Sequence, residues 1–122
     1  MKRKVAVLML TAIIALFVTA CGWNPSVTAV PITRPWDNMN LPVKEDARVW
    51  ASDAKILKVR HKAPRREVAQ RYLDALEKDG WKLTRQPDVR EHGITYDLEK
   101  GGQKLDVDVT EADNTNVIIE KK

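Results

Sequence analysis

The sequence is poor in the residues on which many enzymes depend. Its 122 residues include one cysteine and two histidines, whereas catalytic zinc normally takes three protein ligands. Its two serines, Ser26 and Ser52, stand outside a G-x-S-x-G context, and the chain has neither a phosphate-binding loop nor a GxGxxG motif. A single cysteine forms no internal disulfide, so the fold must depend on its core alone. We therefore expect a non-enzyme without metal or cofactor.

Long apolar runs are also missing, apart from one that follows a basic N-terminus. Residues 2–4 are Lys-Arg-Lys, Val5 to Val18 are apolar except for Thr11, and small residues lead into the cysteine in Val18-Thr19-Ala20-Cys21. A transmembrane helix needs about 20 apolar residues and normally ends at a basic flank. A shorter run between a basic start and small residues is typical of a secretory signal. An uncleaved N-terminal anchor is the alternative.

The same residues resemble the signal of a bacterial lipoprotein, whose lipobox ends in the cysteine that becomes acylated. The resemblance covers residues 1–22. It implies removal of a signal peptide, residues 1–20, and attachment of diacylglyceryl and palmitate chains to Cys21. In Gram-negative lipoproteins an aspartate after the cysteine resembles an inner-membrane retention signal, so Gly22 implies the outer membrane, with the domain facing the periplasm. Each buried methylene adds roughly 0.8 kcal/mol to membrane binding, so the acyl chains anchor the protein without a spanning helix.

Charge gives no case for a nucleic-acid partner. Residues 1–20 hold three of the 21 Lys and Arg residues and none of the 17 Asp and Glu residues. Without them the chain has 18 basic and 17 acidic residues, a formal charge of +1. The basic balance of the whole chain therefore comes largely from the signal. A nearly neutral envelope domain lacks the excess of basic residues that is typical of nucleic-acid-binding proteins.

Residues 21–45 are predicted to form a lipidated, proline-rich tether. The segment shows neither alternation nor a helical period, and it carries four of the six prolines: Pro25, Pro31, Pro35 and Pro42. Proline fixes φ and removes a backbone donor, so about 24 such residues would reach roughly 75 Å when extended. Trp23, next to the lipid, is expected at the membrane interface. Trp36 is expected to cover an edge of the folded domain.

Residues 46–122 are predicted to form one small domain. Strands are expected over 47–51 and 55–61, the second with Leu57 and Val59 inward and with Lys58 and Arg60 outward. A helix is expected from Pro64, which suits the first helical position, to Gly80. Its apolar stripe has helical spacing: Val68, Ala69, Tyr72, Leu73 and Leu76. Trp81 is expected to begin a strand and to close the core, and residues 87–92 to form a loop.

The strongest local signal lies in residues 94–109, where two alternating segments flank Gly101-Gly102. A two-residue glycine loop matches a primed hairpin turn. On one face it would pair Ile94 with Val109, Tyr96 with Val107 and Leu98 with Leu105. On the other it would pair Thr95 with Asp108, Glu99 with Lys104, and Asp97 with Asp106, the last being a destabilising like-charge pair. A final strand is expected over 115–120, with Val117 and Ile119 inward.

The densest polar group consists of Asp97, Glu99, Asp106 and Asp108. Oxygen ligands at alternating strand positions suit Ca²⁺, but no glycine-bent ligand loop accompanies them. The solvent-facing side of an antiparallel sheet normally carries such charges. We therefore interpret the group as solvated surface, with a weak cation site as the alternative. The basic helix start at residues 65–66 is interpreted in the same way, and His61 and His92 are expected to be exposed.

The order of strand, helix and several further strands predicts an α+β two-layer sandwich, with one amphipathic helix on a four- to five-stranded antiparallel sheet. Residues 68–83, with the pattern Tyr72-Leu73-x-x-Leu76-x-x-x-Gly80-Trp81, resemble the helix-on-sheet modules of small envelope lipoproteins, including the accessory lipoproteins of the outer-membrane barrel-assembly machine. The resemblance transfers no catalytic motif and no binding residue. We expect a lipid-anchored, non-catalytic protein-interaction module with an unidentified envelope protein as partner. The alternatives are a small-ligand or cation-binding lipoprotein and self-association through the edge of strand 115–120.

Overall fold

The structure, a computed structural model, describes residues 27–43 and 46–122. The predicted signal peptide, the lipobox with Cys21, and Trp23 lie outside the described residues. In chain order the elements are the 3-10 helix η1 (Trp36–Asn38), strands β1 (Ala47–Ser52) and β2 (Ile56–His61), helix α2 (Arg65–Lys78), and strands β3 (Lys82–Leu83), β4 (Asp88–Val89), β5 (Gly93–Lys100), β6 (Gln103–Glu111) and β7 (Thr115–Lys121).

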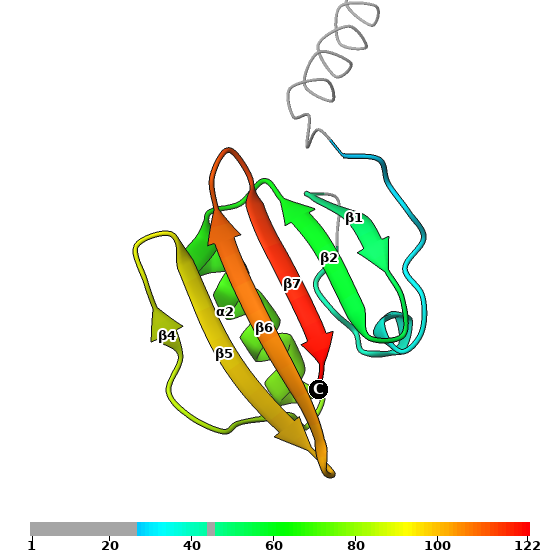
Figure 1. Cartoon of the computed structure of the whole chain (residues 1–122), viewed down its shortest axis with the longest axis vertical. Helices are drawn as coiled ribbons and strands as arrows, with labels where there is room; N and C mark the ends of the chain where they lie inside the picture. Colours follow the sequence, from blue (N-terminus) through cyan, green and yellow to red (C-terminus); the bar gives the residue numbers. More distant parts are fainter. Residues whose placement is uncertain (1–26, 44–45) are drawn as a thin grey trace, which may run out of the picture.

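The seven strands belong to one antiparallel sheet. Their order across the sheet is β1-β2-β7-β6-β5-β3, and β4 also pairs with β5. Helix α2 packs on one face, where it contacts β5, β6 and β7, and Figure 1 shows it behind the strands. The predicted α+β class, with one helix on an antiparallel sheet, is confirmed. The sheet is larger than the predicted four or five strands.

The two shortest strands stand differently against the prediction. Strands β3 and β4 have two residues each and pair with different halves of β5, Lys82 with Glu99 and Asp88 with Thr95. Strand β3 lies where a strand was expected, although it begins one residue after Trp81. Strand β4 was not expected, because two residues cannot show the alternation by which a strand is recognised. The prediction of a loop over 87–92 is therefore wrong at residues 88–89.

The β5–β6 hairpin has the predicted register in every pair. Gly101 and Gly102 at its tip have φ values of 56° and 81°, the left-handed region that a primed turn requires. The pairing places alternate residues of both strands on the buried face. It also places Asp97 directly opposite Asp106, as predicted.

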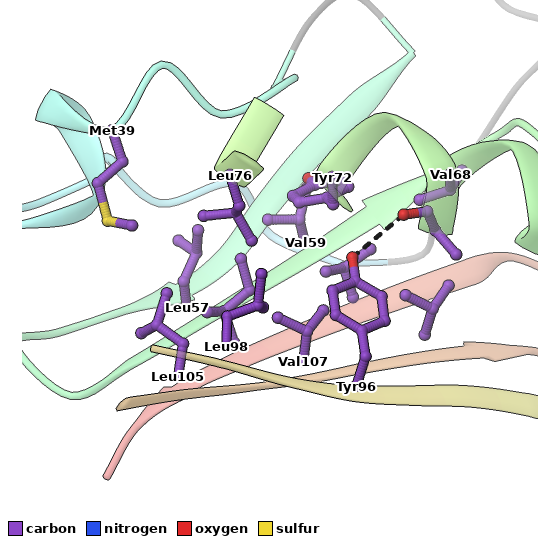
Figure 2. Close-up of a cluster of buried hydrophobic side chains, with 14 of the residues drawn as sticks. Met39, Leu57, Val59, Val68, Tyr72, Leu76, Tyr96, Leu98, Leu105 and Val107 are labelled. Carbon is purple, nitrogen blue, oxygen red and sulfur yellow. Dashed lines mark hydrogen bonds between the residues drawn. The ribbon is translucent and has the colours of Figure 1, made fainter. Parts of the chain in front are cut away.

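Helix α2 lies with its predicted apolar stripe on the sheet. Val68, Tyr72 and Leu76 are fully buried, and Figure 2 shows them facing side chains of the strands such as Leu98 and Val107. Burial of this stripe stabilises the helix, because tertiary packing of an amphipathic face supplies most helical stability. Within the described residues, no helix has the length and apolar character needed to cross a membrane.

A single residue explains where α2 begins and another explains where it ends. Pro64 is the extended residue before the helix rather than its first helical residue. At the other end Gly80 adopts a φ of 97°, which favours glycine. This turn lets the Trp81 amide donate to the Leu76 carbonyl oxygen at 3.0 Å. Trp81 is buried at the end of the core, as predicted.

Part of the segment that was predicted to be a tether packs on the domain. Trp36 is 1% exposed, and its Nε1 donates to the carbonyl oxygen of Asp53 at 2.6 Å. Met39 is also buried, and Figure 2 shows it on the same side of the sheet as Leu76. Trp36 therefore covers the domain as predicted, but residues 27–43 do not form an extended spacer. Their apolar side chains, including Ile32, Leu41 and Val43, pack against the core of the domain.

The first described residues run along the outer edge of β1 (Figure 1). The Val30 amide donates to the Val49 carbonyl oxygen at 2.9 Å, and the Thr33 amide donates to Ser52 Oγ at 2.9 Å. The first contact covers a carbonyl group that a lateral strand otherwise presents to solvent, and the second joins the segment to a side chain of β1. Residues 27–33 therefore line this edge of the sheet.

Strand β7 lies inside the sheet. It pairs with β2 on one side and with β6 on the other along nearly its whole length. Self-association through the edge of the predicted strand 115–120 is therefore excluded, because both of its sides are already hydrogen-bonded. The lateral strands are β1 on one side and the short β3 and β4 on the other.

Trp36→Ala is expected to lower the free energy of unfolding by about 3–5 kcal/mol, the usual cost of truncating a buried tryptophan. The reason is that the indole fills the core and bonds to Asp53. Urea denaturation measures the change. Val89→Ala, at a position that is 58% exposed, serves as the control and should stay within about 0.5 kcal/mol. Equal unfolding midpoints for Trp36→Ala and the unmodified chain would contradict the packing of residues 27–43.

Candidate functional site

The sheet face that points away from α2, here called the outer face, carries the polar side chains of the long strands. Strands β2, β5, β6 and β7 alternate between buried residues and more exposed ones, and the buried ones face α2. No described helix lies over the outer face (Figure 1). Its side chains are therefore accessible to other molecules, and their charges determine which molecules they attract.

The predicted acidic group lies on the β5–β6 half of the outer face. Asp97 is paired with Arg85 at 2.8 Å, Thr95 Oγ1 donates to Asp108 Oδ1 at 2.6 Å, and Lys122 Nζ lies 3.6 Å from Asp106 Oδ2. The structure thus brings the acidic residues together but places basic partners beside them. Within residues 27–43 and 46–122, no group of three or more His, Cys, Asp or Glu side chains is arranged to hold a metal ion.

Asp106 is the least well compensated member of this acidic group. Its Oδ1 is buried without a hydrogen-bond partner. Burial is the largest cause of the raised pKa of Asp106, and the neighbouring carboxylates of Asp97 and Asp108 raise it further, while the charge of Lys122 acts to lower it. The negative charge of Asp106 is therefore held in the folded chain at a cost in stability.

The other half of the outer face, on β1 and β2, is basic. Arg48 lies opposite Arg60 in the register. Lys58 Nζ lies 4.9 Å and Arg60 Cζ 5.7 Å from the ring centroid of Trp50, within the range of cation–π interactions. We call Arg48, Trp50, Lys58 and Arg60 the basic–aromatic cluster. They occupy alternate strand positions, which is why they share one face.

The sequence analysis placed Lys58 and Arg60 outward but missed this cluster. The signal was available, because the alternation that turns Val49 inward turns Arg48 and Trp50 outward. The cluster could be recognised only from the pairing of β1 with β2, because that pairing brings the side chains of the two strands together.

The expectation that His61 is exposed is wrong. The residue is fully buried, because the alternation of β2 places it on the same face as Leu57 and Val59. Its Nε2 lies 2.6 Å from Tyr72 Oη, and its Nδ1 lies 3.6 Å from Asp46 Oδ2. Burial lowers the pKa of His61 and outweighs the Asp46 carboxylate, which acts to raise it.

Asp46 connects this buried pair to the surface of α2. Arg71 Nη1 donates to Asp46 Oδ2 at 3.0 Å, and Arg71 Nη2 donates to Glu67 Oε1 at 3.0 Å. Burial acts to raise the pKa of Asp46, but the hydrogen bond from Arg71 and the charges of His61 and Arg71 lower it overall. Burial raises the pKa of Tyr72, so its hydroxyl stays neutral. Because His61 and Tyr72 are both fully buried, this network joins β2 to α2.

Packed core occupies the space between α2 and the sheet around Tyr72, Trp81 and Tyr96. All three side chains are buried. Tyr96 Oη donates to the Ala69 carbonyl oxygen at 3.1 Å, and Tyr72 Oη bonds with His61. Both phenol groups therefore use their hydrogen-bonding capacity within the protein.

His92 and the basic helix start lie at the surface. The side chain of His92 is 80% exposed, as expected. The Arg65 amide donates to Glu111 Oε2 at 2.9 Å, and its guanidinium donates to the Glu91 carbonyl oxygen. Arg65 therefore fastens the start of α2 to neighbouring segments, whereas Arg66 is exposed.

Two surface hollows accompany these features. One of about 490 Å³ lies over the acidic half of the outer face and is lined in part by Arg85, Asp97 and Asp106. The other, of about 360 Å³, lies between α2 and β4, and Leu73 and Val89 are among the residues that line it. We call the second hollow the β4 groove. It combines apolar side chains with a lateral strand of the sheet.

Comparisons of the chain with protein-family models, with curated proteins and with solved structures each found no match. A function therefore has to be argued from this chain alone. The features that bear on it are the predicted anchor at Cys21, the charged outer face and the β4 groove.

Asp106→Asn is expected to raise the free energy of unfolding at neutral pH by a few tenths to about 1 kcal/mol, because it removes one charge of the Asp97–Asp106 pair. Since the folded chain raises the pKa of Asp106, the cost of its charge should vanish below the ordinary carboxyl value of 3.8. Urea titrations at neutral and acidic pH measure both effects. Asp108→Asn is the matched comparison and should give a smaller gain, because the Thr95 hydroxyl donates to Asp108 and stabilises its charge.

Stability is expected to fall as the pH drops below 6.5, the ordinary histidine value. The unfolded chain takes up a proton there that the folded chain resists, because burial lowers the pKa of His61. His61→Gln can still bond to Tyr72 but does not titrate, so it should flatten this dependence. His92→Gln, the same change at an exposed site, should keep it. Thermal unfolding across this pH range tests the assignment, and identical profiles for the two variants would refute it.

Proposed function

We propose that this chain is a lipid-anchored lipoprotein of the bacterial cell envelope, whose domain acts as a non-catalytic protein-interaction module. Cys21 would carry the acyl chains after removal of residues 1–20, and in a Gram-negative cell the domain would face the periplasm from the outer membrane. The observation that supports this most is the lipobox Val18-Thr19-Ala20-Cys21. Only residues 22–26 separate it from Val27, the first described residue.

The polar chemistry of the domain favours binding to another macromolecule. The buried polar residues, His61 and Thr115, are both engaged within the protein, and Thr115 Oγ1 donates to the Ala63 carbonyl oxygen at 2.6 Å. The remaining chemistry consists of charge and apolar area at the surface, by which protein surfaces recognise one another. The alternative of a small-ligand or cation-binding lipoprotein gains no support from any described side-chain group.

We place the protein contact at the β4 groove. Val89 is 58% exposed, and Leu73 of α2 lines the same hollow. Strand β4 is lateral in the sheet, so its outer backbone groups can pair with an added strand. The opposite edge, at β1, is lined by residues 27–33 and offers less of this pairing.

The anchor is tested by the intact mass of the protein from its native membranes. The expected species begins at Cys21 and carries two or three acyl chains. Cys21→Ser is expected to block both acylation and cleavage, because the signal peptidase acts on the lipidated cysteine in the family that this signal resembles. A native protein with residues 1–20 retained and an unmodified thiol would overturn the proposal.

Site-specific crosslinking in intact cells tests the interaction. A photo-reactive amino acid in place of Val89 is expected to yield a reproducible adduct with one envelope protein, identified by mass spectrometry. The same substitution at Asp74, on the exposed side of α2, is the control and should not yield it. Recovery of the lipoprotein alone, or the same adduct from both positions, would speak against the β4 groove as the contact.

A further inference from the structure

We propose that the basic–aromatic cluster binds the anionic headgroups of the membrane in which Cys21 is anchored. The inference rests on the proposed lipid anchor and deepens it, because it gives the domain an orientation. The β1 edge lies against the bilayer, and the β4 groove lies on the side away from it. Three observations carry this inference: chain length, charge distribution and the setting of Trp50.

The length of chain ahead of the domain is the first observation. The carbonyl oxygen of Val27 accepts a hydrogen bond from Arg48 Nη1 at 3.1 Å, so Val27 is attached beside the cluster. Six residue steps from Cys21 to Val27 reach at most about 22 Å. A spacer of roughly 75 Å, as the sequence suggested, would leave the domain free to turn in any direction. The shorter reach keeps the β1 side of the domain near the lipid.

The distribution of charge over the outer face is the second observation. One row of the register runs from Lys58 on β2 through Ile118 on β7 to Asp108 on β6. The basic–aromatic cluster lies at the β1–β2 end of this row, and the acidic group lies at the β5–β6 end. An anionic surface attracts the first more strongly than the second, whose carboxylates are partly balanced by Arg85 and Lys122. It therefore turns the β1 side toward the membrane, in the same sense as the attached chain.

The setting of Trp50 is the third observation. The indole lies on the outer face beside Lys58 and Arg60, and its Nε1 is buried without a hydrogen-bond partner. Arg60 Nε also donates to Asn116 Oδ1 at 2.9 Å, which holds the guanidinium over the sheet. Tryptophan and basic side chains together are enriched where proteins meet headgroups. The cluster therefore has the composition of an interfacial contact.

Co-sedimentation with lipid vesicles tests the inference without the anchor. A chain of residues 22–122 contains every residue of the described core and lacks Cys21. It is expected to bind vesicles that contain phosphatidylglycerol and not vesicles of phosphatidylcholine alone. Binding should weaken as salt is added, because ions screen exposed charges.

Two double variants with the same change of charge locate the contact. Arg48→Gln with Lys58→Gln is expected to weaken vesicle binding about fivefold for each charge removed. Lys82→Gln with Lys104→Gln removes two cations near the acidic group and should leave binding nearly unchanged. Urea denaturation of both variants verifies that they fold alike.

Tryptophan quenching reports the orientation separately from the affinity. In a Trp23→Phe background, brominated phosphatidylglycerol is expected to quench the emission of Trp50. It should not quench Trp36 or Trp81, which are buried. Adding Trp50→Phe should remove the quenched part of the signal.

Several results would overturn the inference. They are binding to neither kind of vesicle, equal binding to both kinds, equal binding by the two double variants, and absence of Trp50 quenching. A dimer in sedimentation that is lost in the Arg48→Gln, Lys58→Gln variant would also overturn it, because the cluster would then face a second copy of the chain. Failure of the anchor proposal would appear instead in the intact mass of the native protein, which has no bearing on vesicle binding by residues 22–122.

Discussion

The burial of one face of the sheet beneath α2 is the constraint on which the rest of the molecule depends. Val68, Tyr72 and Leu76 cover the inward side chains of the long strands, and alternation then directs every second residue to the outer face. Charged residues accumulate there because they are excluded from the core. The strand order separates them, with cations on β1 and β2 and carboxylates on β5 and β6. The electrostatic asymmetry of the surface is therefore a consequence of how the core is built.

The fold was predictable where local signals agreed. Alternation and Gly101-Gly102 together specify the β5–β6 register, because a tight glycine turn allows one pairing, and the apolar stripe specifies α2. The signal was insufficient for β4, whose two residues show no period. It was misleading for residues 27–43, where the prolines favoured an extended tether although the segment packs on the domain through Trp36 and Met39. His61 was misjudged because its residue type was weighed above its place in the alternation of β2, and its partner Tyr72 lies on another element.

The candidate sites were predictable to the degree that their residues lie close together in the sequence. The acidic group was found as a unit, since all four residues belong to one hairpin whose register the sequence determines. The basic–aromatic cluster was not found, because it exists only where β1 and β2 pair and Trp50 meets Lys58. Cys21 was found from a linear motif that needs no folding at all, and its acylation remains a prediction. Long-range packing, as between Asp46 and Arg71, left no comparable pattern in the sequence.

The lining of the β1 edge by residues 27–33 has a consequence for how copies of the chain can meet. A sheet with two open edges can add neighbours on both sides and grow into a fibre. Here the Val30 amide bonds to the Val49 carbonyl oxygen and the Thr33 amide bonds to Ser52 Oγ along one edge, so an added strand meets the chain's own N-terminal segment there. Strand addition at that edge is therefore disfavoured, and with it the open-ended growth that needs two free edges.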